Sequence, residues 1–223
     1  MTRETAIRRV LKPAVFALAL GPLLWLAWVL STSDLGPKGP LGANPIEYVN
    51  RYLGDWAIRF LLMALAVTPL RGLTGWTTVM RFRRMLGLYA FFYACLHLSS
   101  YVGVDQFFDW RAIWKDIVKR NYITVGMLTI LMLLPLAATS TKGMVKRLGG
   151  QRWTKLHRLV YPAGIAACFH FYMMRKGVQL EPIIYAAICA GLLGYRVALH
   201  LKKKAAEAAN AAANRGKARA PAS

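Results

Sequence analysis

The segment Trp153–Tyr172 most constrains this chain, because it is apolar enough to cross a bilayer as a helix and carries His157 and His170 near its opposite ends. Ionisable side chains are costly at membrane depth, so where they occur they usually mark a functional site. His157 precedes His170 by thirteen residues, about 20 Å along a helix axis. At about 100° per residue the two side chains face different sides, although Pro162 can bend the helix between them.

The composition is typical of a membrane protein. Hydrophobic residues make up 57% of the chain and charged residues only 17%, whereas soluble domains average about 25% charged. The net charge of +21 lies in short segments between apolar runs and in the C-terminal tail, a pattern of membrane topology rather than of nucleic-acid binding. Cys95, Cys168 and Cys189 stand singly within apolar runs and form no CxxC pair, which indicates small buried hydrophobes.

Six apolar runs predict six membrane-spanning helices. The first follows a basic N-terminus, and because no clear A-x-A cleavage site comes after it, we expect it to be retained. Residues 31–55 are rich in Gly and Pro and predict a loop. The expected spans are Ala14–Leu30, about Trp56–Leu70 with an extension back through Tyr52, Met85–Val102, Tyr122–Ala138, the histidine segment continued to Met174, and Pro182–Leu199.

Most Lys and Arg residues lie in the N-terminus, in the 71–84 and 139–155 loops and in the tail, so these segments should face the cytoplasm. We therefore predict an all-α, six-helix transmembrane bundle with both termini cytoplasmic. Residues 1–13 form a basic N-terminus, residues 14–200 one membrane domain, and residues 201–223 a basic, Ala-rich, flexible tail that is solvated or attracted to anionic lipid. Trp110 and Trp114, in the loop on the other side, suit a membrane interface.

His97 and His170 are expected towards the outer leaflet. They lie about twelve and sixteen residues into the third and fifth spans, which both run from inside to outside. Two neutral imidazoles from facing helices can take both axial positions of one haem iron. A proton relay or a structural hydrogen bond is the alternative interpretation.

His157, near the inner end, suits a second haem nearer the cytoplasm. Fourteen residues before His97 stands Arg83, with Arg84 beside it and no histidine. A protonated guanidinium has no free lone pair and is a rare iron ligand. Three interpretations stay open: one haem only, an inner haem on His157 with an open or water-filled site, or an inner haem with Arg83 as ligand. Otherwise Arg83 is an exposed loop arginine at the cytoplasmic interface.

Two further side chains have competing interpretations. Arg59 lies close in depth to His97 and can pair with a haem propionate, for which a bidentate guanidinium is well suited; equally, it can extend to the interface. His200 ends the sixth span among lysines and is expected on the surface.

Several motifs resemble the ferric-reductase-like transmembrane domain family over about residues 10–200. They are Leu86-Gly87-Leu88-Tyr89, Leu96-His97-Leu98-Ser99-Ser100-Tyr101 and Trp153-Thr154-Lys155-Leu156-His157-Arg158-Leu159-Val160-Tyr161. In that family, paired histidines on the third and fifth helices hold two stacked haems. His97, His157 and His170 match three of the four positions, and Arg83 occupies the fourth. The resemblance therefore implies one or two b haems, with the inner site departing from the family pattern.

The resemblance is strongest to a bacterial branch whose members are haem-binding membrane subunits serving a periplasmic protein-methionine-sulfoxide reductase. It implies an inner-membrane protein that passes electrons from the quinone pool, or from a cytoplasmic flavin reductase and with FMN bound, to a molybdenum-containing partner that reduces the substrate. The sequence has no Gly-rich nucleotide motif, so we expect the electrons to come from another protein or from membrane quinol. The basic 71–84 loop can hold a flavin phosphate or dock a flavin reductase, although topology alone explains such charge. The rival functions are a ferric or other metal-ion reductase and a histidine-using transporter or proton channel.

Overall fold

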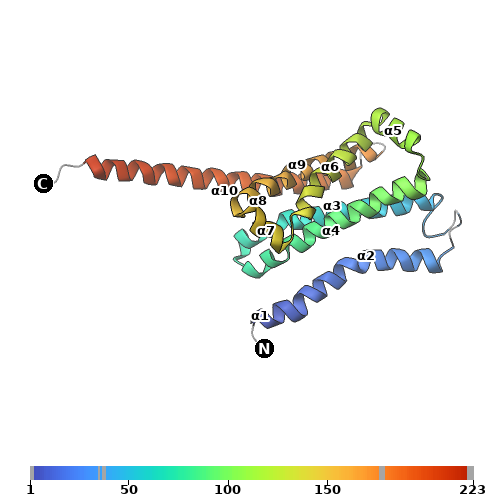
Figure 1. Cartoon of the computed structure of the whole chain (residues 1–223), viewed down its shortest axis with the longest axis horizontal. Helices are drawn as coiled ribbons and strands as arrows, with labels where there is room; N and C mark the ends of the chain where they lie inside the picture. The colour runs from blue at the N-terminus through green and yellow to red at the C-terminus, as the bar shows by residue number, and fades with distance from the viewer. Residues whose placement is uncertain (1–2, 35, 37–38, 176–178, 220–223) are drawn as a thin grey trace.

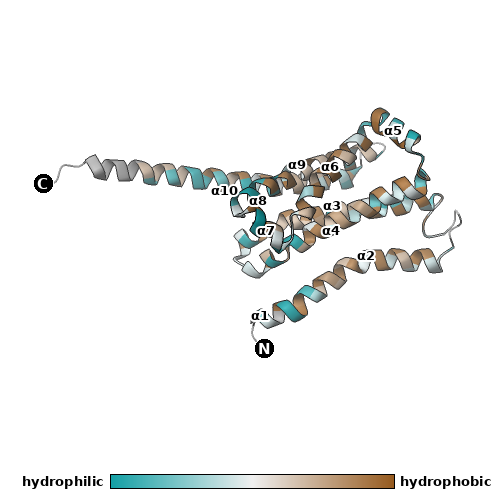
Figure 2. Ribbon diagram, in the orientation of Figure 1, coloured by the Kyte–Doolittle hydropathy of each residue, from teal (hydrophilic) through white to brown (hydrophobic). Residues whose placement is uncertain are grey.

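The computed structural model describes residues 3–34, 36, 39–175 and 179–219, and these form an all-helical protein (Figure 1). The long helices α3, α4, α6 and α9 lie side by side with the first part of α10, while α2 runs along one side and the rest of α10 projects alone. Hydrophobic residues, coloured brown, run along the bundle, whereas the α7–α8 region and the projecting part of α10 carry hydrophilic residues, coloured teal (Figure 2). The elements are α1 Arg3–Ala6, η1 Ile7–Leu11, α2 Lys12–Thr32, α3 Pro45–Thr74, η2 Thr77–Arg81, α4 Arg83–Ser99, η3 Ser100–Asp105, α5 Trp110–Lys119, α6 Asn121–Ala138, α7 Lys142–Leu148, α8 Gly150–Leu156, η4 His157–Leu159, α9 Val160–Met174 and α10 Leu180–Arg219.

Among the described residues, five helical segments are long and apolar enough to cross a membrane. They are Ile7–Thr32, Pro45–Thr74, Arg83–Asp105, Asn121–Ala138 and Leu180–Ala211. The predicted span without such a helix is the fifth, the histidine segment continued to Met174, which contains α9 with only 15 residues. The all-α prediction is confirmed, whereas the count of six spans and the orientation of the termini stay predictions. The C-terminal tail is helical as far as Arg219 as part of α10.

The loop predicted over residues 31–55 is shorter than expected, because α3 already begins at Pro45. Proline is favourable at the first position of a helix, where its missing N–H has no helical partner in any case. The side chain of Asn44 accepts a hydrogen bond from the Glu47 N–H at 3.2 Å and caps this end. The helix then runs 30 residues to Thr74 and ends at Gly75, whose φ of 70° is left-handed.

The histidine segment is not one continuous helix, which corrects the expectation from its hydropathy. α8 ends at Leu156, a 3₁₀ turn covers His157–Leu159, and α9 begins at Val160. Pro162 has no N–H to donate to the Arg158 carbonyl, and its ring crowds that carbonyl in a continuous helix. Within the first turn of α9 the missing N–H costs little. His157 therefore lies at a helix break, and helical phase does not fix its direction relative to His170.

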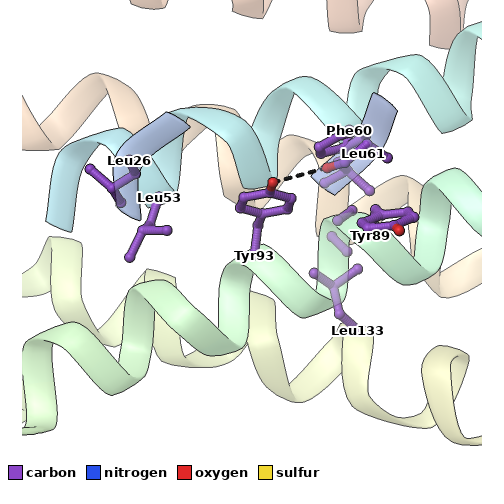
Figure 3. Packing of buried hydrophobic residues seen from close by; sticks show 10 residues of the cluster. Leu26, Leu53, Phe60, Leu61, Tyr89, Tyr93 and Leu133 are labelled. Carbon is purple, nitrogen blue, oxygen red and sulfur yellow. Dashed lines mark hydrogen bonds between the residues drawn. The ribbon is translucent and has the colours of Figure 1, made fainter. Parts of the chain in front are cut away.

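A buried tyrosine joins α2 to the bundle. Tyr93 of α4 is 0% exposed, and its hydroxyl donates to the Ala19 carbonyl at 2.9 Å (Figure 3). The same oxygen accepts a hydrogen bond from the Leu23 N–H at 3.2 Å. Ala19 and Leu23 are one helical turn apart, so the hydroxyl bridges two groups that would otherwise bond to each other. An inserted side chain of this kind is a recognised cause of helix bending.

Candidate functional site

His97 of α4 and His170 of α9 face each other inside the bundle, as the sequence predicted. Their ring centroids are 6.2 Å apart, with an angle of 71° between the ring planes. A metal–imidazole bond is about 2 Å long, so two nitrogens on opposite sides of one metal ion are about 4 Å apart. Ring centroids lie behind the ligating nitrogens, and the observed separation suits two axial ligands of a single iron.

Backbone carbonyls fix the orientation of both imidazoles. His97 Nδ1 lies 2.8 Å from the Asn50 carbonyl oxygen of α3, and His170 Nδ1 lies 2.6 Å from the Tyr122 carbonyl oxygen of α6. A carbonyl only accepts, so each Nδ1 carries the proton and each Nε2 keeps its lone pair. This is the arrangement in which a histidine coordinates metal through Nε2 while its other nitrogen is held by a carbonyl.

A glycine makes room for each ring. A Cβ atom on Gly54 would be 3.1 Å from His97 Nδ1, and one on Gly126 would be 2.8 Å from His170 Cε1. Each glycine lies one helical turn after the residue that supplies the carbonyl, so the same four-residue arrangement is used on α3 and on α6. These glycines could not be singled out from the sequence, because their role depends on which helix faces which histidine.

A cavity of about 380 Å³ lies between α3, α4, α6 and α9, and both histidines line it. Small side chains let the helix backbones border it closely: Gly54, Ala57, Ala90, Ala94, Gly126 and Ala167. The rim near α5 is polar and includes three arginines, Arg51, Arg120 and Arg175. Facing ligands, an interior with small apolar side chains and cations among the lining residues fit a haem, whose ring is flat and apolar and whose propionates are anionic. Haem supplies reversible one-electron chemistry when it is bound.

Arg59 does not line this cavity. Its Nε donates to the Tyr185 hydroxyl at 2.7 Å, and another of its nitrogens lies 3.4 Å from a Glu181 carboxylate oxygen. Both partners belong to α10. In the structure α10 thus supplies a carboxylate and a hydroxyl to Arg59. Its pairing with a haem propionate and its extension to the interface both stay predictions.

His157 lies apart from the cavity. Its Nε2 is 3.0 Å from the Thr139 hydroxyl, and its ring stacks on Trp153 with centroids 3.9 Å apart. The Trp153 indole N–H in turn donates to the Thr139 carbonyl at 2.9 Å. The structure therefore brings two of the three candidate histidines together and holds the third in a separate aromatic and hydroxyl environment.

Arg83 is the first residue of α4 and is half-buried, not exposed in a loop. It interacts electrostatically with His157, as does Arg84, and it is also within electrostatic range of Arg196 and Tyr161. The structure thus places Arg83 near His157, and a role for either residue at an inner haem stays a prediction. His200 is exposed on α10.

Comparison with known proteins identifies the family. Residues 53–168 match the model of the ferric reductase like transmembrane component. A protein-methionine-sulfoxide reductase heme-binding subunit MsrQ from Rhodospirillum rubrum is 55% identical over 191 residues, covering 86% of this chain and 89% of the relative. The corresponding subunit of Caulobacter vibrioides is 48% identical over 82% of this chain and 84% of its own length, and that of Herminiimonas arsenicoxydans is 49% identical over 84% of each. The chain therefore belongs to the ferric reductase like transmembrane family and, within it, to the MsrQ heme-binding subunits.

Proposed function

We propose that this protein is a membrane electron-transfer subunit that binds haem between His97 and His170. The observation that carries the proposal is the facing pair of imidazoles. Each has Nδ1 hydrogen-bonded to a carbonyl, which leaves the lone pair of Nε2 available to bind iron. The sequence contains no C-x-x-C-H attachment motif, so the haem is b-type, held without a covalent thioether link. The rim arginines Arg51, Arg120 and Arg175 are positioned to meet its propionates.

The proposed setting is the bacterial inner membrane, with six spans, residues 14–200 as the membrane domain and residues 201–223 as a cytoplasmic tail. The distribution of Lys and Arg supports this orientation. It directs the cavity rim near α5 towards the periplasm. α9 belongs to the fifth span, and with 15 residues it crosses the apolar core only together with the α8–η4 segment before it.

In the proposed route, electrons enter from membrane quinol, or from a cytoplasmic flavin reductase through bound FMN, and leave to a periplasmic molybdenum-containing methionine sulfoxide reductase. The names of the relatives support a methionine sulfoxide reductase as the partner. Sulfoxide reduction takes place in the partner, and the residues of this chain hold and tune the electron carrier. A transporter that protonates its histidines is less well supported, because both imidazoles are fixed by backbone carbonyls.

Purified protein tests the proposal. We expect a Soret band and, on dithionite reduction, the sharp visible bands of a bis-histidine haem. The reduced protein should reoxidise rapidly when the periplasmic reductase and methionine sulfoxide are added. With a ferric chelate alone, it should reoxidise slowly. Rapid reoxidation by the chelate alone would favour a metal-ion reductase. A colourless but well-folded preparation would refute electron transfer by haem.

A further inference from the structure

Asp55 is a carboxylate in the wall of the cavity. It follows Gly54, the glycine that packs against His97, and it lines the cavity together with Arg175. Its side chain is only 18% exposed, and its nearest cation is Arg175, at 3.7 Å. A carboxylate so placed is poorly hydrated, and an ion pair at this distance is a weak one.

The cation beside Asp55 is shared with a second acid. Arg175 is closer to Glu181, at 3.3 Å, and Glu181 also pairs with Arg59, at 3.4 Å. Arg59 is further bonded to Tyr185. Glu181 therefore has two guanidinium partners at shorter distances, whereas Asp55 has one at a longer distance. Of the two acids, Asp55 is the one whose negative charge is less compensated.

The other carboxylates that line the cavity are in contact with solvent. Glu47 is 49% exposed and pairs with Arg51 one turn along α3. Asp105 is exposed and accepts a hydrogen bond from Gln106. Water and a close partner stabilise the charges of these two groups at the rim. Arg51, Arg59, Arg175 and Glu181 are the charged groups that act on Asp55 itself.

We propose that Asp55 is the proton acceptor of this cavity, taking up one proton when an electron enters and releasing it when the electron leaves. The inference rests on the proposed function, because the electron is the one carried between His97 and His170. A unit of negative charge added in a poorly solvated site repels a nearby carboxylate strongly. The arginines are already protonated and cannot take up another proton. The two imidazoles are hydrogen-bonded to their carbonyls, so Asp55 is the side chain able to compensate the added charge.

The step is balanced without a further reactant. The donor, a quinol or a reduced flavin, supplies one electron, and water at the rim supplies one proton. The Asp55 carboxylate becomes a carboxylic acid, and the total charge of the cavity is unchanged. The polar side chains of Asn44, Glu47 and Arg51 line the same cavity as Asp55, and we place the approach of the proton along them.

Redox titration of the haem-loaded protein in lipid nanodiscs tests the proposal. We expect the midpoint potential to fall as pH rises, because the reduced state binds the extra proton more tightly. For a one-electron, one-proton couple, each tenfold change in proton concentration shifts the potential by up to about 59 mV. Asp55→Asn should abolish the slope. Asp109→Asn is the matched control, because Asp109 is not among the residues that line the cavity and its side chain caps α5, and it should keep the slope.

Infrared difference spectra of the wild-type protein provide a test that does not depend on a variant folding. Reduction should produce a carboxylic-acid C=O band that shifts in heavy water, and Asp55→Glu should move this band and keep a slope. A wild-type potential independent of pH, or a slope that survives Asp55→Asn, would overturn the role of Asp55 while leaving the haem proposal intact. A protein without haem would instead overturn the proposed function.

Discussion

The Arg196 guanidinium of α10 donates a hydrogen bond to the backbone carbonyl of Leu65 in α3. Leu65 lies four residues before Pro69, so its carbonyl is the one that Pro69, lacking an N–H, leaves without a helical partner. The same guanidinium donates to the Tyr161 hydroxyl of α9 at 3.1 Å. One arginine thus satisfies a proline-freed carbonyl and ties three helices together.

This relationship predicts coupling between Arg196 and Pro69. Arg196→Met leaves a buried carbonyl unpaired and should lower the free energy of unfolding by about 1–3 kcal/mol. In a Pro69→Ala background the helix supplies its own N–H to the carbonyl, so the same substitution should cost less. Denaturant titration in detergent of the four proteins of this cycle gives the coupling energy. Arg152→Met, at an exposed position on α8, should have little effect, and equal costs in both backgrounds would contradict the assignment.

The helices could largely be predicted from hydropathy, and the span expected over Tyr122–Ala138 differs from α6 by one residue at its start. The start of α3 could not, because Asn44 and Pro45 are both turn formers and helix starters, and only the bundle decides between these roles. The break at His157–Leu159 was missed for a similar reason. Hydropathy reports the environment of a segment, whereas Pro162 acts on the backbone.

The pairing of His97 with His170 was predictable from depth, because each lies at a similar distance along a predicted span. The carbonyls of Asn50 and Tyr122 and the glycines after them were not. Their function depends on the rotation of α3 against α4 and of α6 against α9, which no single helix encodes. The sequence did contain one signal. On each neighbouring span, a residue expected at the depth of the histidine is followed four residues later by a glycine.

Tyr93→Phe should destabilise the packing of α2 on the bundle. The substitution removes the hydroxyl that bridges Ala19 and Leu23 and leaves up to two backbone groups unpaired at a buried position, at a cost of about 1–3 kcal/mol each. Thermal unfolding in detergent measures the loss, with Tyr172→Phe as a control at an exposed position. Unchanged stability would show that α2 closes its own hydrogen bond once the hydroxyl is gone.

Gly126→Ala should weaken the haem site without weakening α6. Alanine favours a helix by about 0.5–1 kcal/mol over glycine, but its Cβ would be 2.8 Å from His170 Cε1, so the ring must move away from the Tyr122 carbonyl. We expect less bound haem per protein and an altered Soret band. Gly87→Ala in α4 is the matched control, because nothing lies within 4 Å of the added carbon. Identical spectra for both variants would argue that the glycine does not support the ring.

The family resemblance implies a second, inner haem at His157, with Arg83 in the position of its other ligand. In the structure, the Nε2 of His157 contacts the Thr139 hydroxyl, so ligation of a second iron requires this contact to break. If the inner haem exists, the wild-type protein binds two haems, His157→Ala binds one, and Arg83→Ala changes the spectrum of the inner haem only. His97→Ala and His170→Ala should each remove the outer haem, because each leaves one axial position empty. The pyridine haemochrome assay on protein quantified by amino-acid analysis gives these ratios. A wild-type ratio near one that His157→Ala leaves unchanged would contradict the second haem and leave Trp153, Thr139 and His157 as a structural contact between helix ends.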